Sequence, residues 1–385
     1  MKSGGRLRNS RDDLFPDQRG WQWADPTQLR LDPAALDAAV AFAVANDSDW
    51  PQSLFLPDGR YVGNAYAADA PPHDCPIGIV RPRGPAAGLV VRSGRAVASW
   101  GDIDRPDTSF SVAKSYLALL LGVALDDGLI RAVDDPVRRY MPADDDGFTD
   151  PHNAGITWRQ LLRQTSEWQG TLWGIPDSVD RNRRWGPGDE QPASDGERAA
   201  EAPGSRWEYN DVRVNRLALA LLRVFRKPLP DVLHDRIMDP IGASSTWRWE
   251  GYRNSIVEID GTGMVSVCGG SHWGGGLFMS TSDHARTGWL VANGGAWRDH
   301  RIVSADWIDA LGEPGEAHPQ YGHLWWTNRG SGLFPFAPES SIFALGGGNH
   351  LIWVDRELEL VVVSRWIRAE QCDGLIERIV ASIAA

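Results

Sequence analysis

The chain has 385 residues, and its 39 Lys and Arg against 51 Asp and Glu give a formal net charge of −12. Hydrophobic residues make up 42% and charged residues 23%, which is typical of a folded globular protein and argues against disorder, collagen and coiled coil. The acidic balance and the lack of a Lys/Arg-rich block argue against a nucleic-acid partner.

The sequence shows no targeting segment and no membrane span. The first ten residues lack the apolar run of roughly 7–15 residues that a signal peptide requires, and the longest apolar helix pattern, near residues 117–125, is too short to cross a bilayer. We therefore expect a cytoplasmic protein without a membrane partner. The three cysteines, Cys75, Cys268 and Cys372, are far apart and have neither disulfide-framework nor zinc-site spacing.

Helix and strand patterns alternate along the chain in a definite order. In that order we predict a helix over 34–45 behind Asp32-Pro33, a hairpin of 88–92 with 95–100 around Ser93-Gly94, a long helix over about 109–127, helical patterns at 158–163 and 214–226, a second hairpin of 351–354 with 360–363, and a terminal helix over 373–384.

This order predicts an α+β fold. The early and late strands would form one central antiparallel sheet between helices, an α/β/α sandwich, with an all-helical domain inserted between them. We place the sheet-containing domain at residues 1–110 and 255–385 and the mainly helical domain at 111–254. Such an arrangement puts a cleft, and the active site, at the junction between the two domains.

The chain contains 19 tryptophans, which is its most unusual compositional feature. Trp158, Trp168, Trp173 and Trp185 lie in or beside expected loops, where either core packing or a cleft-lining role would account for them. Of these, Trp168 and Trp173 are our candidates for substrate contact.

The segment Phe110-Ser111-Val112-Ala113-Lys114-Ser115 starts the long apolar helix. The i, i+3 spacing puts the Ser111 hydroxyl and the Lys114 ammonium on one face, one turn apart. Serine becomes a nucleophile when an adjacent base takes its proton, and the helix N-terminus offers backbone N–H groups for a developing oxyanion. By itself, Ser-x-x-Lys also occurs by chance as a solvated pair near a helix start.

Its context resembles the penicillin-recognising serine hydrolases, in particular the class C β-lactamase-like branch with its DD-peptidases, esterases and 6-aminohexanoate-dimer hydrolases. Segments similar to that branch follow in family order over about residues 86–366: Asp134-Asp135-Pro136-Val137, Leu161-Leu162-Arg163-Gln164-Thr165-Ser166, Pro203 to Tyr209, Gly274-Gly275-Gly276-Leu277 and Tyr321 to Trp326. The resemblance implies the β-lactamase/transpeptidase-like fold.

The second family motif, Tyr-x-Asn, is matched by Tyr209-Asn210-Asp211. The resemblance implies that Tyr209 shuttles protons together with Lys114. Asp211 departs from the usual Asn and adds a negative charge where an amide both donates and accepts. It could pair with Lys114 or Arg213, or repel an anionic substrate.

The third family motif carries a cation, Lys or His, on a strand at the edge of the cleft. Here the segment is Ala344-Leu345-Gly346-Gly347-Gly348-Asn349, which has no cation. Its backbone can still supply an oxyanion N–H, for which Leu345 is the first candidate and Gly346 or Gly347 follow. A nucleotide-binding loop is a rival interpretation of the glycines, but no Gly-Lys-Ser/Thr or Gly-x-Gly-x-x-Gly context surrounds them.

No other motif suggests a cofactor or a metal. The histidines include no His-x-x-x-His pair, His318 and His323 flank a proline-containing loop, and no Gly-x-Ser-x-Gly elbow is present. The sequence thus predicts a monomeric or homodimeric serine hydrolase without cofactor, acting on small carboxylic esters or linear amides. The alternatives are a β-lactamase or DD-peptidase-type amide hydrolase, and a non-catalytic binding protein on the same fold.

Overall fold

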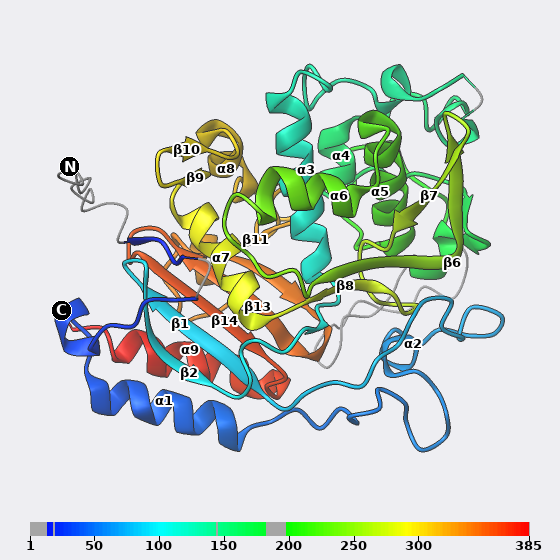
Figure 1. Cartoon of the computed structure of the whole chain (residues 1–385). Helices are drawn as coiled ribbons and strands as arrows, with labels where there is room; N and C mark the ends of the chain where they lie inside the picture. The colour runs from blue at the N-terminus through cyan, green and yellow to red at the C-terminus, as the bar shows by residue number, and fades with distance from the viewer. Residues whose placement is uncertain (1–13, 18–19, 144, 182–197, 385) are drawn as a thin grey trace, which may run out of the picture.

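The computed structural model describes residues 14–17, 20–143, 145–181 and 198–384. Trp185, one of the four loop tryptophans, lies outside these residues. A six-stranded antiparallel sheet with the order β11-β12-β13-β14-β1-β2 forms the centre of the larger layered part (Figure 1). Its strands are β1 Ala87–Arg92, β2 Arg95–Trp100, β11 Trp326–Thr327, β12 Ile342–Gly346, β13 His350–Asp355 and β14 Leu360–Arg365.

The early and late strands meet in this sheet, as predicted. Strand β14 pairs antiparallel with β1, so that Val90 lies opposite Val362. Both expected hairpins are confirmed: β1 turns into β2 through Ser93 and Gly94, which both have positive φ, and β13 pairs with β14. An added Cβ on Gly94 would lie 2.0 Å from the Leu14 carbonyl oxygen, so the turn requires glycine there.

Helices cover both faces of the sheet. On one face α1 Pro33–Ala45 and α9 Cys372–Ala381 pack beside each other, and on the other lie α7 Thr281–Ala292 and α3 Val112–Asp126 (Figure 1). Side chains along β14 alternate between the two faces of the sheet. Leu360 and Val362 pack in the core beneath α1 and α9, whereas Val361 and Val363 pack in the core beneath α3 and α7. The expected α+β sandwich is therefore the observed architecture.

The predicted helices begin close to where the sequence placed them. Helix α1 follows Pro33, and Asp32 caps it by accepting the Ala34 N–H at 2.8 Å. Helix α3 is buried on all sides from Val112 to Ala124, which makes it the central helix. The other helices are α2 Val62–Tyr66, α4 Trp158–Leu162, α5 Asp211–Phe225, α6 Leu229–Leu233 and α8 Ala305–Leu311.

A second sheet lies against the helical part of the molecule. It has four strands in the order β3-β8-β6-β7, namely β3 Asp107–Thr108, β6 Arg248–Ile259, β7 Thr262–Val267 and β8 Gly276–Met279. Two short pairs complete the strands, β4 Thr171–Leu172 with β5 Ile175–Pro176 and β9 Ala296–Trp297 with β10 His300–Arg301. The domain boundary we placed at 254/255 falls inside β6, and this long strand joins the two parts without a break. None of the described helices combines the length and apolarity that a bilayer crossing demands.

Candidate active site

The residue before Ser111, at the start of α3, has a strained backbone. Phe110, the residue before it, has a φ of +47°, a left-handed conformation that a bulky side chain rarely adopts. The Phe110 ring is held by edge contacts with Trp50 and Trp366, at centroid distances of 5.5 and 6.0 Å. Strain of this kind persists only where surrounding packing over-determines it, and it concentrates at functional sites.

Ser111 and Lys114 are in contact. The Lys114 Nζ donates a hydrogen bond to Ser111 Oγ at 2.8 Å, as their spacing on one helix face predicts. The Lys114 side chain is only 2% exposed, and its ammonium forms an ion pair with Asp211 Oδ1. A buried lysine therefore holds the serine hydroxyl on one side and a carboxylate on the other.

Tyr209 completes this cluster from the start of α5. Lys114 Nζ lies 4.6 Å from the centre of the Tyr209 ring. The motif sits at a helix N-terminus because the Asn210 side chain caps α5, accepting the Arg213 N–H at 3.1 Å. The structure thus brings Ser111, Lys114, Tyr209 and Asp211 together from two helices that are far apart in the sequence.

Asp211 pairs with Lys114 rather than with Arg213, the other partner that the sequence left open. Arg213 instead pairs with Glu167 at 2.9 Å and Glu208 at 3.0 Å. Burial opposes the ionisation of Glu167, but hydrogen bonds from Arg198 and the charge of Arg213 outweigh it and lower the pKa of Glu167 to about 2. Arg213 is thus committed to other carboxylates.

Two contacts that the sequence did not reveal hold the motif in place. The Asp211 backbone N–H donates to Asp180 Oδ2 at 2.7 Å, and the Asn210 N–H donates to Gln164 Oε1 at 2.8 Å. Gln164 also donates to the hydroxyl of Tyr321 at 2.7 Å, and burial, with the neighbouring Tyr209, raises the pKa of Tyr321 well above its usual value. Tyr321 is therefore a neutral supporting residue.

The end of β12 touches the backbone around Ser111. A Cβ added to Gly346 would lie 2.4 Å from the Ser109 carbonyl oxygen and 3.2 Å from the Ser111 nitrogen, so only glycine permits this approach. In the part of the chain that the structure describes, the Ser111 N–H donates to no backbone carbonyl. This amide is a candidate donor for an oxyanion hole, together with the one that the sequence predicts among Leu345, Gly346 and Gly347.

A pocket of about 420 Å³ opens beside Tyr209 and the β12 end. Trp326 stacks beside Tyr209 with ring centroids 6.3 Å apart. The other residues that line it are mostly apolar or aromatic on the inside and charged at the rim: Ser48, Asp49, Trp50, Tyr66, Phe334, Leu345, Gly346, Gly347, Gly348, Asn349, His350, Leu351, Arg368, Ala369, Glu370 and Cys372.

Neither candidate tryptophan lines this pocket. Trp168 is 2% exposed and donates its indole N–H to the Gly147 carbonyl at 2.6 Å, within the helical part. Trp173 lies in the turn between β4 and β5, where its carbonyl accepts from Asn254. Trp50 and Trp326 line the pocket, and the substrate contact of Trp168 and Trp173 stays a prediction.

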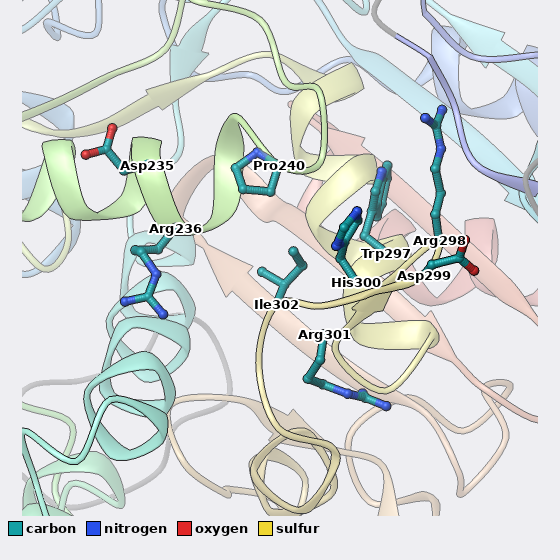
Figure 2. A pocket seen from close by; sticks show the side chains of 9 residues that line it. All are labelled: Asp235, Arg236, Pro240, Trp297, Arg298, Asp299, His300, Arg301 and Ile302. Atoms are coloured by element: carbon teal, nitrogen blue, oxygen red, sulfur yellow. The ribbon is translucent and has the colours of Figure 1, made fainter.

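A larger cavity of about 620 Å³ lies elsewhere, between the segment Asp235–Pro240 and the β9–β10 hairpin (Figure 2). Figure 2 shows the side chains of Arg236, Arg298 and Arg301 pointing in different directions rather than toward one point. Arg236 is already paired with Asp127. Its lining includes neither Tyr209 nor the end of β12, whereas the lining of the smaller pocket includes both, so chemistry and not size selects the smaller pocket as the candidate active site.

Comparisons with known proteins give a family and a fold for the chain. A family model described as Beta-lactamase matches residues 83–364. A penicillin-binding protein homologue from Caulobacter crescentus is 16% identical with a TM-score of 0.56 over 77% of this chain and 92% of that chain. A family VIII carboxylesterase is 16% identical with a TM-score of 0.54 over the same shares.

EstCE1, described as a hydrolase with promiscuous acyltransferase activity, is 15% identical with a TM-score of 0.56 over 92% of this chain and 99% of that chain. At these identities the likeness is one of fold. The search of curated proteins returned no match.

Proposed function

The chain belongs to the beta-lactamase family, and we propose that it is a serine hydrolase that cleaves small carboxylic esters or linear amides through an acyl-enzyme on Ser111. The observation that carries this proposal is the contact of the buried Lys114 side chain with Ser111, in which Lys114 Nζ and Ser111 Oγ lie 2.8 Å apart at the start of α3. A serine hydroxyl held by a potential proton shuttle beside backbone N–H groups is the arrangement that acyl transfer requires.

In the first half of the reaction, Ser111 Oγ attacks the substrate carbonyl carbon, and its proton passes to the pair formed by Tyr209 and Lys114. The Lys114 ammonium, over the Tyr209 ring, stabilises negative charge on the phenolate that accepts this proton. The carbonyl oxygen becomes an oxyanion that the Ser111 N–H and one amide of Leu345, Gly346 or Gly347 stabilise. Collapse then expels the alcohol or amine, which takes the proton.

In the second half, water attacks the acyl-enzyme and the same pair of residues takes its proton. Breakdown releases the carboxylic acid and returns the proton to Ser111 Oγ. Asp211 contributes by holding the Lys114 ammonium in place through the ion pair. The reaction uses no group beyond the protein and water.

The pocket beside Tyr209 supports neutral, moderately apolar substrates. Its interior is formed by Trp50, Trp326, Phe334 and Leu345, and the β12 end has no cation to bind a substrate carboxylate. The rim does carry Arg368, but this guanidinium lies 3.3 Å from Asp49. The negative charge of Asp49 offsets the attraction of Arg368 for an anionic substrate.

A β-lactamase or DD-peptidase-type activity is the second candidate, and Arg368 is the observation that favours it. As a cation lining the pocket, Arg368 could bind a substrate carboxylate in place of the missing Lys or His. A non-catalytic binding protein is less well supported, because such a protein has no use for the buried contact among Ser111, Lys114 and Tyr209.

Labelling with a fluorophosphonate, located by mass spectrometry, tests the proposal. The adduct should lie on Ser111, and the Ser111→Ala variant should not be labelled. Ser115→Ala is the matched control, since Ser115 lies one turn further on the same helix and donates to the Leu324 carbonyl. Absence of labelling in the folded wild type would favour the binding protein.

A further inference from the structure

Three buried metal-ligating side chains converge next to the candidate active site. His272 Nε2 lies 3.1 Å from Asp69 Oδ2 and 3.4 Å from Asp180 Oδ1. Asp69 follows α2, Asp180 ends the 3₁₀ turn Asp177–Asp180, and His272 lies in the loop between β7 and β8. The three side chains are only 2%, 0% and 2% exposed.

A hydrogen bond alone explains this convergence poorly. An imidazole nitrogen carries at most one hydrogen, yet two carboxylate oxygens face the same Nε2 of His272. Only one of the two oxygens can accept this hydrogen in line, and the two oxygens lie within 4.8 Å of each other. Two carboxylates buried this close repel each other unless a positive charge lies between them.

The spacing of the three atoms matches adjacent ligands of one metal ion. A tetrahedral ion with metal–ligand distances of about 2.0–2.1 Å separates its ligands by about 3.3 Å. The two distances from His272 Nε2, 3.1 and 3.4 Å, bracket this value. One imidazole and two carboxylates are also a donor set that suits Zn²⁺.

Asn64 orients one of the three ligating side chains. Its side chain is 1% exposed, and its Nδ2 donates to Asp69 Oδ2 at 2.9 Å. Its Oδ1 is buried and accepts no hydrogen bond from the described residues. Asn64 Nδ2 also donates to the His73 carbonyl at 3.3 Å, so the amide in this orientation holds the Asp69 carboxylate in place beside His272.

We propose that Asp69, Asp180 and His272 bind one Zn²⁺ ion, with water as the fourth ligand. This site lies outside the Ser111 cluster and is structural, because it joins three segments that are far apart in the sequence. It also bears on the active site, since Asp180 uses its other oxygen to accept the Asp211 N–H. Metal binding would fix Asp180 and, through it, the helix start that carries Asp211 and Tyr209.

The experiment measures metal on untagged full-length protein. After purification with a low level of Zn²⁺ and exhaustive desalting, elemental analysis should find about one zinc per chain. A chelator should remove it and lower Tm by several degrees, and Zn²⁺ should restore Tm while Mg²⁺ does not. His272→Gln and Asp69→Asn should each lose the zinc and the response of Tm to added Zn²⁺.

His234→Gln is the matched control, because His234 forms an exposed pair with Asp235, 2.9 Å away, and should keep the full zinc content. The zinc content of the wild type and the response of its Tm to Zn²⁺ test the proposal even where a variant fails to fold. Zinc well below one equivalent, with no rise of Tm when Zn²⁺ is added, would overturn the proposal and leave the three side chains as a cluster without a metal ion. These readouts do not involve hydrolysis, so they are independent of the proposed activity.

Discussion

The carboxylate of Asp211 forms an ion pair with the ammonium of Lys114 where both side chains are almost fully buried, 3% and 2% exposed. The same ammonium donates to Ser111 Oγ. A buried charge whose partner is removed is costly, whereas an exposed pair contributes little. The Asp211–Lys114 pair therefore connects the stability of the helix junction with the chemistry of the serine.

The first prediction concerns the nucleophile. Ser111→Ala should abolish hydrolysis of p-nitrophenyl butyrate, because no other group in the cluster replaces the hydroxyl, while Tm stays within a few degrees of the wild type. Steady-state kinetics and thermal melts measure both. Turnover persisting in a protein free of contaminating esterase would rule out Ser111.

The second prediction concerns the proton relay. Lys114→Ala and Tyr209→Phe should each reduce kcat/KM by a large factor, and the double variant should lose little more than the worse single variant, because the two side chains act as one unit. Purified variants compared by circular dichroism separate catalysis from unfolding. Losses that simply multiply would mean that the residues act independently.

The third prediction concerns the buried ion pair. Asp211→Ala should lower the free energy of unfolding by about 3–5 kcal/mol, since it leaves the Lys114 ammonium buried without its carboxylate. Asp134→Ala is the control, because Asp134 is 66% exposed in its pair with Arg159, and it should cost about 1 kcal/mol or less. Urea denaturation of both variants tests the difference, and equal losses would contradict the structural role of the pair.

Local patterns predicted the helices, both hairpins and the Ser111–Lys114 contact, because each depends on residues close together in the sequence. The family resemblance added Tyr209. The sequence did not predict the contact of Asp211 with Asp180, because no local pattern indicates a hydrogen bond between a helix start and a turn that is distant in the sequence. Trp168 and Trp326 both lie in polar, glycine-containing segments, so the sequence does not distinguish a core tryptophan from one that lines a pocket. The hydrogen bond from Trp168 to the distant Gly147 carbonyl identifies Trp168 as the core residue.

The fourth prediction concerns acid stability. Burial, together with the charges of Arg163 and Arg159, lowers the pKa of His323 to about 4, although its bond to the Ala310 carbonyl acts in the opposite direction. Between that value and the ordinary 6.5, the unfolded chain holds a proton at this residue that the folded chain does not. Stability therefore falls as pH falls through this window.

Below pH 4, proton uptake by the unfolded chain at His323 should lower the free energy of unfolding by about 3 kcal/mol in total. About 2 kcal/mol of this decrease should already be present at pH 5. Burial lowers the pKa of His284 and His350 in the same direction. Urea denaturation of the wild type and His323→Gln at pH 7.5 and 5.0 measures the contribution. A pH dependence as steep in the variant as in the wild type would exclude His323 as its source.

The last prediction concerns the charge of the substrate. A β-lactam carboxylate entering the pocket meets Leu345, Gly346 and Gly347 where relatives offer a cation, and it lies near Asp49 and Glu370 at the rim. A charge-assisted hydrogen bond is worth about 1.5–3 kcal/mol, so its loss alone weakens recognition roughly 10- to 150-fold. We expect kcat/KM for p-nitrophenyl butyrate to exceed that for nitrocefin by at least this factor, and Asp49→Asn to narrow the gap by leaving Arg368 without its carboxylate. Efficient hydrolysis of nitrocefin by the wild type, lost in Arg368→Gln but kept in the surface control Arg356→Gln, would instead identify Arg368 as a carboxylate anchor and make the protein a β-lactamase.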